Sequence, residues 1–273
     1  MAGSELSTGA AILYGLIQGI TEFLPISSDG HLKLAHRLGV GTMAPNLELP
    51  FDVLLHSATL VAIVIGFWRD LLASLKQSPR FYGLMLISMV PVGIAGLLGK
   101  RVVEAAGEAF WIIGLCYAFN AILLYVSEEI SKRHTQVETE DPSRILGRIT
   151  LRQAVFVGLL QVLALLPGVS RSGTTISGAL LGGMGPRLAV SYSFLVGFPL
   201  ISAAVAKDAL DGGVAELVAA VGVGPLAIAL LVTLVSGLAA VAVLRQLARR
   251  RMMRGFAVYC GFVAMLCFAF ELG

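Results

Sequence analysis

Long apolar segments separated by short polar ones run through most of this 273-residue chain. Six of them are long and almost free of charge, at residues 51–68, 81–99, 109–126, 189–206, 223–244 and 255–272. A spanning helix needs roughly 20 mostly apolar residues, because the bilayer core holds no water to satisfy exposed backbone groups. The pattern therefore predicts an all-α integral membrane protein with about six transmembrane helices.

Two further apolar segments are too short to cross a membrane. Residues 11–24 end at Pro25, and residues 154–166 end at Pro167. At about 1.5 Å of rise per residue, each helix would reach only partway through the bilayer. Irregular backbone at that depth is tolerated only where it lines a protein-enclosed or water-filled cavity. We therefore expect two re-entrant helical hairpins, each broken at a turn of Pro, Ser and Gly.

These two short segments carry one repeated pattern. Gly, Leu and Gln at residues 15–18, with Leu, Pro, Ser and Gly at 24–30, recur at residues 158–161 and 166–173. Each copy precedes three spanning segments, so we divide the single membrane domain, 1–273, into repeats of about 1–126 and 153–273 joined by a polar connector, 127–152. Odd numbers of spans per repeat predict an inverted topology.

The loop charges predict the same alternation independently. Lys and Arg are in excess after the first, third and fifth spans, and the loops between them are poorer in net positive charge. Because cytoplasmic loops are enriched in Lys and Arg, the connector is expected in the cytoplasm and both termini outside.

Composition supports a membrane protein and excludes one class of partner. Hydrophobic residues make up 57% of the chain and charged residues 14%, with a mean hydropathy of +0.86, well outside the range of soluble domains. The net charge is only +3, and the basic residues are scattered over short loops instead of forming a stripe. No nucleic acid partner is expected.

The first hairpin turn contains an acid and several hydroxyl groups. Gln18 and Glu22 are four residues apart, so they project from one helix face. An ionisable group such as Glu22 in an apolar stretch is costly unless it faces a cavity or a partner, which favours a functional role over capping of the local turn. Ser27, Ser28 and His31 follow it.

The second hairpin turn has the composition of a phosphate site. Arg171 stands among Ser170, Ser172, Gly173 and Thr175, just before a new helix is expected. Glycines let backbone N–H groups approach an anion, the helix start supplies a positive dipole end, and Arg matches phosphoryl oxygens with its fork of donors. The structural alternative is that a serine caps the helix while Arg171 extends to the membrane interface.

An inverted repeat would bring the two turns together around one site. We assign catalytic roles to Glu22, Ser28, His31 and Arg171, and phosphate binding to Gln18, Ser27, Ser170, Ser172, Gly173 and Thr175. These groups suit phosphoryl transfer, in which positioning and charge neutralisation contribute most of the catalysis.

Two mechanisms stay open at this point. In one, Ser28 attacks phosphorus while His31 or Glu22 handles the proton. In the other, Glu22 and a bound divalent cation activate water.

Two other polar residues rank lower. Asp29 could add a metal ligand, but a role in forming the turn is favoured. His56 lies within the first span and could reach the cavity, although a lone histidine there more often bonds a neighbouring helix.

At these motifs the chain resembles a known family, the bacterial undecaprenyl-diphosphate phosphatases of the bacitracin-resistance BacA type. The resemblance rests on Gln18, on the run Glu22-Phe23-Leu24-Pro25-Ile26-Ser27-Ser28 with Gly30-His31, and on Pro167-Gly168 with Ser170-Arg171-Ser172-Gly173 and Thr175. Length, span number and the repeat also match, so it covers nearly the whole chain.

The resemblance implies hydrolysis of undecaprenyl diphosphate to undecaprenyl phosphate and inorganic phosphate, for recycling of the peptidoglycan lipid carrier. It implies a multi-pass protein of the bacterial cytoplasmic membrane with its site open to the outer, periplasmic face, supported by Mg or Ca ions, and bacitracin resistance when abundant. The expected partners are a polyprenyl diphosphate and membrane lipid, and a homodimer is compatible with the pattern.

The chain departs from the family at the first motif. The family has Glu or Gln at the position of Gln18, and the neutral residue here leaves Glu22 as the candidate metal ligand of this helix.

A transporter or flippase of polyprenyl phosphate, or of another anion, is the rival function, because many carriers are inverted repeats with broken helices. Such a carrier has no evident need for Glu22, Ser28 and His31 together.

Overall fold

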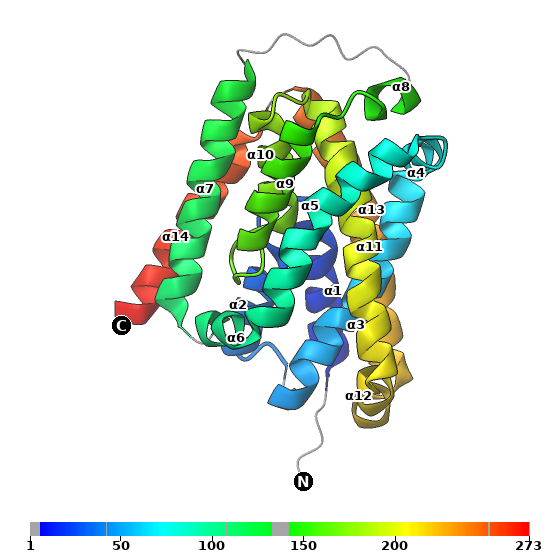
Figure 1. The fold of residues 1–273 in the computed structure, drawn as a ribbon. Coiled ribbons are helices and arrows are strands. Elements are labelled where there is room, and N and C mark those ends of the chain that lie inside the picture. The colour runs from blue at the N-terminus through cyan, green and yellow to red at the C-terminus, as the bar shows by residue number, and fades with distance from the viewer. Residues whose placement is uncertain (1–5, 42, 108, 133–141, 251, 273) are drawn as a thin grey trace.

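The computed structural model describes residues 6–41, 43–107, 109–132, 142–250 and 252–272, which form helices and no strands. The helices in chain order (Figure 1) are α1 (Thr8–Phe23), α2 (Ser28–Arg37), α3 (Pro45–Gly66), α4 (Trp68–Ser74), α5 (Pro79–Leu98), α6 (Lys100–Gly107), α7 (Phe110–Lys132), α8 (Pro142–Leu146), α9 (Leu151–Leu163), α10 (Arg171–Leu181), α11 (Pro186–Leu210), α12 (Gly213–Val221), α13 (Val223–Arg249) and α14 (Arg254–Leu272).

Six helices, α3, α5, α7, α11, α13 and α14, are long and apolar enough to cross a membrane. They coincide with the six segments predicted from the sequence, so the all-α membrane architecture is confirmed. Their outer faces are apolar as well. On α5, Leu86, Val90 and Ile94 recur every fourth residue and are 57%, 50% and 54% exposed. Such a stripe suits contact with lipid instead of water.

The helix boundaries differ from expectation at the connector. Helix α7 continues to Lys132, past the predicted span end at residue 126, so the connector begins inside a helix. Glu128 on this extension is buried and lies 2.9 Å from Lys132, and it accepts a hydrogen bond from the backbone N–H of Arg254. Residues 133–141 of the connector lie outside the described residues.

The loops alternate between two ends of the molecule. Helices α4 and α8 lie at one end, whereas α2, α6 and α12 lie at the other, toward which α14 also ends (Figure 1). The order of these short helices along the chain matches the alternation predicted from loop charge. Which end faces the cytoplasm stays a prediction.

Each short hairpin packs its first helix against a spanning helix of the other half of the chain. Helix α1 contacts α13, where a Cβ atom added to Gly15 would lie 2.6 Å from the carbonyl oxygen of Ala229. Helix α9 contacts α5, where a Cβ atom at Gly158 would lie 2.8 Å from the carbonyl oxygen of Ile87. Gly15 and Gly158 are matched positions of the sequence repeat. This reciprocal packing fits two related halves, and their inverted relation stays a prediction.

The first hairpin turns between α1 and α2. Helix α1 ends at Phe23, and the carbonyl oxygen of Pro25 accepts a hydrogen bond of 2.8 Å from Asn120 Nδ2 on α7. Ser27 takes a φ of 68°, in the left-handed region, and its hydroxyl accepts from the N–H of Gly30 to cap α2. The strained residue therefore stands directly before Ser28, at the start of a helix.

The second hairpin turns between α9 and α10 and touches the first. Gly168 has a φ of 97°, and Ser170 caps α10 by accepting a hydrogen bond of 3.0 Å from the N–H of Gly173. A Cβ atom at Gly30 would lie 2.9 Å from Gly168 Cα, so the turns meet backbone to backbone. Two helix starts, at Ser28 and Arg171, are thereby brought to the same region.

Candidate active site

An ion pair joins the two hairpins. Nη2 of Arg171, on the first residue of α10, lies 2.6 Å from Oε1 of Glu22, near the end of α1. The Glu22 side chain is 6% exposed and that of Arg171 18%. Removal of either charge from such a buried pair is strongly destabilising, because the other charge is then left without a partner. The sequence expectation that these two side chains meet is matched by this contact.

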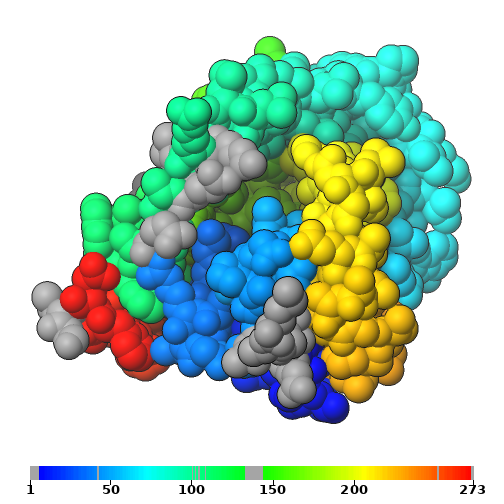
Figure 2. Space-filling model, turned by 90° about the horizontal axis from the view of Figure 1, so that it is seen from below, coloured from blue at the N-terminus to red at the C-terminus, as the bar shows by residue number. Residues whose placement is uncertain are grey.

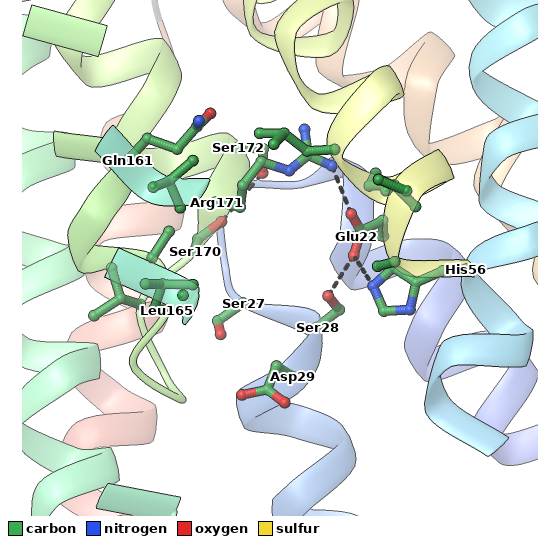
Figure 3. Close-up of a pocket in the computed structure, with 18 of the residues that line it drawn as sticks. Glu22, Ser27, Ser28, Asp29, His56, Gln161, Leu165, Ser170, Arg171 and Ser172 are labelled. Carbon is green, nitrogen blue, oxygen red and sulfur yellow. Dashed lines mark hydrogen bonds and ion pairs between the residues drawn. The ribbon is translucent and has the colours of Figure 1, made fainter. Parts of the chain in front are cut away.

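Hydroxyl and imidazole groups converge on the other carboxylate oxygen of Glu22. Ser28 Oγ donates a hydrogen bond of 2.5 Å to Oε2, and His56 Nε2 lies 3.4 Å from the same atom (Figure 3). Gln18 Nε2 also donates to Oε2 at 3.4 Å. Glu22 is thus surrounded by donors from α1, α2, α3 and α10.

Glu22, Ser28, His56 and Arg171 line a cavity of about 530 Å³. Figure 2 shows the end of the molecule that carries α6 and α12, with a hollow visible between α5, α3 and α11. The deep wall is polar, with Glu22, Ser28 and Arg171 among its residues, and the remaining wall is largely apolar, from α5 and α11. The cavity therefore combines a charged end with an apolar wall.

The part of the deep wall around Arg171 favours an anion. The helices α2 and α10 both begin at it, so two positive dipole ends point toward the same space. Nη1 of Arg171 has no hydrogen-bond acceptor within the described part of the chain, although it is buried. The Arg171 guanidinium also lies over the ring of Phe194, 5.4 Å from its centroid, a cation–π contact that helps to hold it in place. A phosphoryl group placed here would find an unused donor of Arg171.

Six of the ten residues chosen from the sequence line the cavity, namely Glu22, Ser27, Ser28, Ser170, Arg171 and Ser172. Ser170 and Ser172 are linked by their hydroxyls at 3.1 Å, and the Ser172 hydroxyl donates to the carbonyl oxygen of Leu24 in the first hairpin. Ser170 does cap α10, as the structural alternative held. Arg171, however, turns inward to Glu22 instead of extending to an interface.

His31 lies behind the cavity wall. Its Nδ1 is 2.7 Å from the hydroxyl of Tyr117 and from the carbonyl oxygen of Ser27, and its Nε2 is 2.7 Å from the hydroxyl of Tyr259. Both ring nitrogens are therefore engaged, and His31 is not among the residues that line the cavity. Of the two proton acceptors considered for Ser28, Glu22 is the one within hydrogen-bonding distance.

Three other candidates support the wall instead of facing the cavity. The N–H of Gly173 is taken up by the Ser170 hydroxyl. Thr175 Oγ1 bonds the carbonyl oxygen of Arg171 at 2.8 Å and lies 2.5 Å from the Ser193 hydroxyl. Gln18 reaches Glu22 but not the cavity wall.

Sequence reasoning gave too little weight to three positions. His56, ranked low as a lone histidine, lines the cavity beside Glu22. Gln161 also lines it, fully buried, with Nε2 donating to the carbonyl oxygen of Ser88. Its pairing with Gln18 in the repeat was a usable signal. Gly197 on α11 leaves room for Arg171, since a Cβ atom there would lie 2.2 Å from Nη1, and no sequence pattern marked it.

The donors around Glu22 do not fit a metal ion held by this carboxylate. Oε1 is taken by a guanidinium, and Oε2 receives a hydroxyl and faces an imidazole. Within the described residues, no three His, Cys, Asp or Glu side chains are grouped closely enough to hold an ion. Asp29 also lines the cavity, but it lies in the first turn of α2, which Ser27 caps. A requirement for Mg or Ca stays a prediction.

A second polar cluster ties α2 to α1 and to the first turns of α3. His36 Nε2 lies 3.1 Å from Asp52 Oδ1, and Nδ1 lies 2.9 Å from the hydroxyl of Tyr14, which donates to the carbonyl oxygen of Val40. Burial disfavours the charged imidazole, but the hydrogen bond and negative charge of Asp52 outweigh it and raise the pKa of His36 above its ordinary value of 6.5.

Known proteins resemble this chain over nearly its whole length. The family model described as bacitracin resistance protein BacA matches residues 11–266. Undecaprenyl-diphosphatase 1 of Shouchella clausii is 33% identical over 277 residues, covering 96% of this chain and 95% of that protein. Undecaprenyl-diphosphatases of Halothermothrix orenii (34%, covering 93% and 95%) and Novosphingobium aromaticivorans (37%, covering 78% of each) are also similar.

Proposed function

The chain belongs to the family of the bacitracin resistance protein BacA, and we propose from this membership that it hydrolyses undecaprenyl diphosphate to undecaprenyl phosphate and inorganic phosphate. Its relatives are named for this activity. In a bacterium the product is the lipid carrier on which peptidoglycan precursors are assembled, so the reaction returns the carrier to use. An excess of the enzyme protects against bacitracin.

The pairing of Glu22 with Arg171 at the head of an apolar cavity is the observation that carries the proposal. A polyprenyl diphosphate has a charged head and a long apolar chain. The deep wall offers the Arg171 donors and two helix starts to the head, and apolar residues such as Val92, Leu97 and Leu200 suit the chain. The prenyl chain also keeps the substrate in the membrane beside the site.

The short contact between Ser28 and Glu22 favours the serine mechanism over direct attack by water. Ser28 Oγ attacks the terminal phosphorus as its proton passes to Glu22 Oε2, 2.5 Å away. The bond from phosphorus to the bridging oxygen breaks, and undecaprenyl phosphate leaves with the electron pair. Water then attacks the phosphoserine, Ser28 regains a proton, and inorganic phosphate is released. Arg171 stabilises the charge on the equatorial oxygens in both steps.

A divalent cation enters this proposal only with the substrate. Mg and Ca prefer oxygen ligands, and Mg commonly binds through substrate phosphates with few protein carboxylates, so the diphosphate itself would be its main ligand. Asp29 is the cavity carboxylate nearest in sequence to the reacting Ser28. No step described above passes through the ion.

The site is proposed to open toward the outer, periplasmic face of the cytoplasmic membrane. The basic loops at the end with α4 and α8 support this orientation, because such loops stay in the cytoplasm. The cavity opens near α6 and α12, at the other end (Figure 2). A homodimer stays a prediction.

The test is phosphate release by the purified protein given undecaprenyl diphosphate, with and without Mg or Ca. We expect release by the wild type and a loss of at least about 100-fold in Arg171→Lys, which keeps the charge but not the fork of donors. A wild type that binds the lipid without releasing phosphate would refute the enzyme and favour a carrier of polyprenyl phosphate.

A further inference from the structure

His56 reaches the reacting carboxylate from α3. Its ring lines the cavity, with the side chain 25% exposed, and its Nε2 lies 3.4 Å from Glu22 Oε2 (Figure 3). Its Nδ1 lies 2.8 Å from the backbone carbonyl oxygen of Asp52, one helical turn earlier. The ring is therefore fixed between its own helix and the carboxylate on α1.

The partners of the ring decide the roles of its two nitrogens. A carbonyl oxygen only accepts, so Nδ1 carries a proton and donates to Asp52. A carboxylate that receives the Ser28 hydroxyl also only accepts, so Nε2 faces Glu22 as a donor. The contact between His56 and Glu22 is thus a charge-assisted one.

The contact acts on the oxygen that takes the serine proton. Arg171 holds Oε1 from the side of the second hairpin, whereas the other two donors at Oε2, Gln18 and Ser28, are uncharged, and Ser28 gives up its proton in the reaction. His56 holds Oε2 from the opposite side, beside Ser28. A glutamate side chain has three rotatable bonds, and a second charged donor removes much of that freedom.

We propose that His56 is a positioning residue for this reaction: by holding Glu22 Oε2, it keeps the carboxylate aligned to accept the proton of Ser28. This inference rests on the proposed function and on Ser28 as the nucleophile. A merely structural contact between α3 and α1 would affect stability. The contact of His56 with Glu22 is instead expected to affect kcat more than KM, because it acts through the residue that accepts the serine proton.

Three substitutions of His56 separate these roles. In His56→Gln the amide nitrogen reaches the position of Nε2 and still donates to Glu22. In His56→Asn the amide nitrogen reaches only the position of Nδ1, toward Asp52. His56→Leu removes both contacts. We expect His56→Leu and His56→Asn to lower kcat by about 10- to 100-fold with KM within about twofold of wild type, and His56→Gln to keep a clearly higher kcat than either.

The experiment measures kcat and KM for these variants on undecaprenyl diphosphate, with thermal unfolding in the same detergent as the control for folding. In a Glu22→Gln background, His56→Leu should lower kcat little further, because the two residues act as a unit. An undiminished kcat in His56→Leu, or an Asn variant as active as the Gln variant, overturns the positioning role. An inactive wild type refutes the proposed function and this inference with it.

Discussion

The side chains of Glu22 and Arg171 form an ion pair of 2.6 Å although 149 positions separate them in the chain. Glu22 lies near the end of α1, before the first turn, and Arg171 is the first residue of α10, after the second turn. The two hairpins touch at Gly30 and Gly168. The pair therefore depends on the correct depth of both hairpins. A charge left without its partner at this depth is strongly unfavourable. The same contact consequently joins the two hairpins and holds Arg171 at the cavity wall.

Substitution of Ser28 distinguishes attack by serine from attack by water. We expect Ser28→Ala to lower kcat by more than about 1000-fold, because the nucleophile is lost while the anion site remains. The measurement is steady-state phosphate release, with lipid binding as the control. A Ser28→Ala variant that keeps most of the wild-type kcat would instead support water activated by Glu22.

Gly197 sets the position of the Arg171 guanidinium. We expect Gly197→Ala to lower kcat/KM by about 10- to 100-fold, because the new methyl group would stand 2.2 Å from Nη1 and displace it. Gly261→Ala on α14, where a Cβ atom meets nothing within 4 Å, is the matched control and should keep wild-type activity. Equal activity of the two variants would show that Arg171 tolerates displacement.

The His36 cluster predicts a pH dependence of stability. The folded pKa of His36 is raised above 6.5, so its contribution is fully present below about pH 6.5 and is lost as pH rises through the folded pKa. We expect the unfolding temperature of the wild type to fall from about pH 6.5 upward, with a flatter profile in His36→Gln, which does not titrate. Parallel profiles for the two proteins would contradict this assignment.

Membrane orientation is tested by cysteine labelling in intact cells. The three native cysteines, Cys116, Cys260 and Cys267, are buried and give a low background. We expect an impermeant maleimide to label Leu38→Cys, near α2, and not Gly147→Cys, beside α8. Labelling of Gly147→Cys from outside would reverse the proposed orientation and place the cavity mouth in the cytoplasm.

Much of the architecture was predictable because hydrophobic length and loop charge are strong signals in a membrane protein. The six spans were found from runs of apolar residues, and the two short hairpins from Pro25 and Pro167. The contact of Glu22 with Arg171 followed from the repeat. These features are periodic or local, so one sequence is enough to reveal them.

Details that depend on packing were not predictable. His31 and His56 are both histidines near the same turn in space, yet the ring of His31 is held by Tyr117 and Tyr259, whereas His56 reaches Glu22. The rotation of each helix about its own axis decides which imidazole faces the cavity. The spacing of residues along the chain does not specify that rotation. Gly197 was missed for a similar reason, because its role depends on the space occupied by Arg171.

The backbone contact between Gly30 and Gly168 also limits how this scaffold moves. Alternating-access carriers rock one bundle against another around a central site. Here such rocking of one repeat against the other would separate Gly30 from Gly168 and break the ion pair of Glu22 with Arg171 in every cycle. A rigid scaffold whose cavity opens at one end avoids this repeated loss of the buried ion pair.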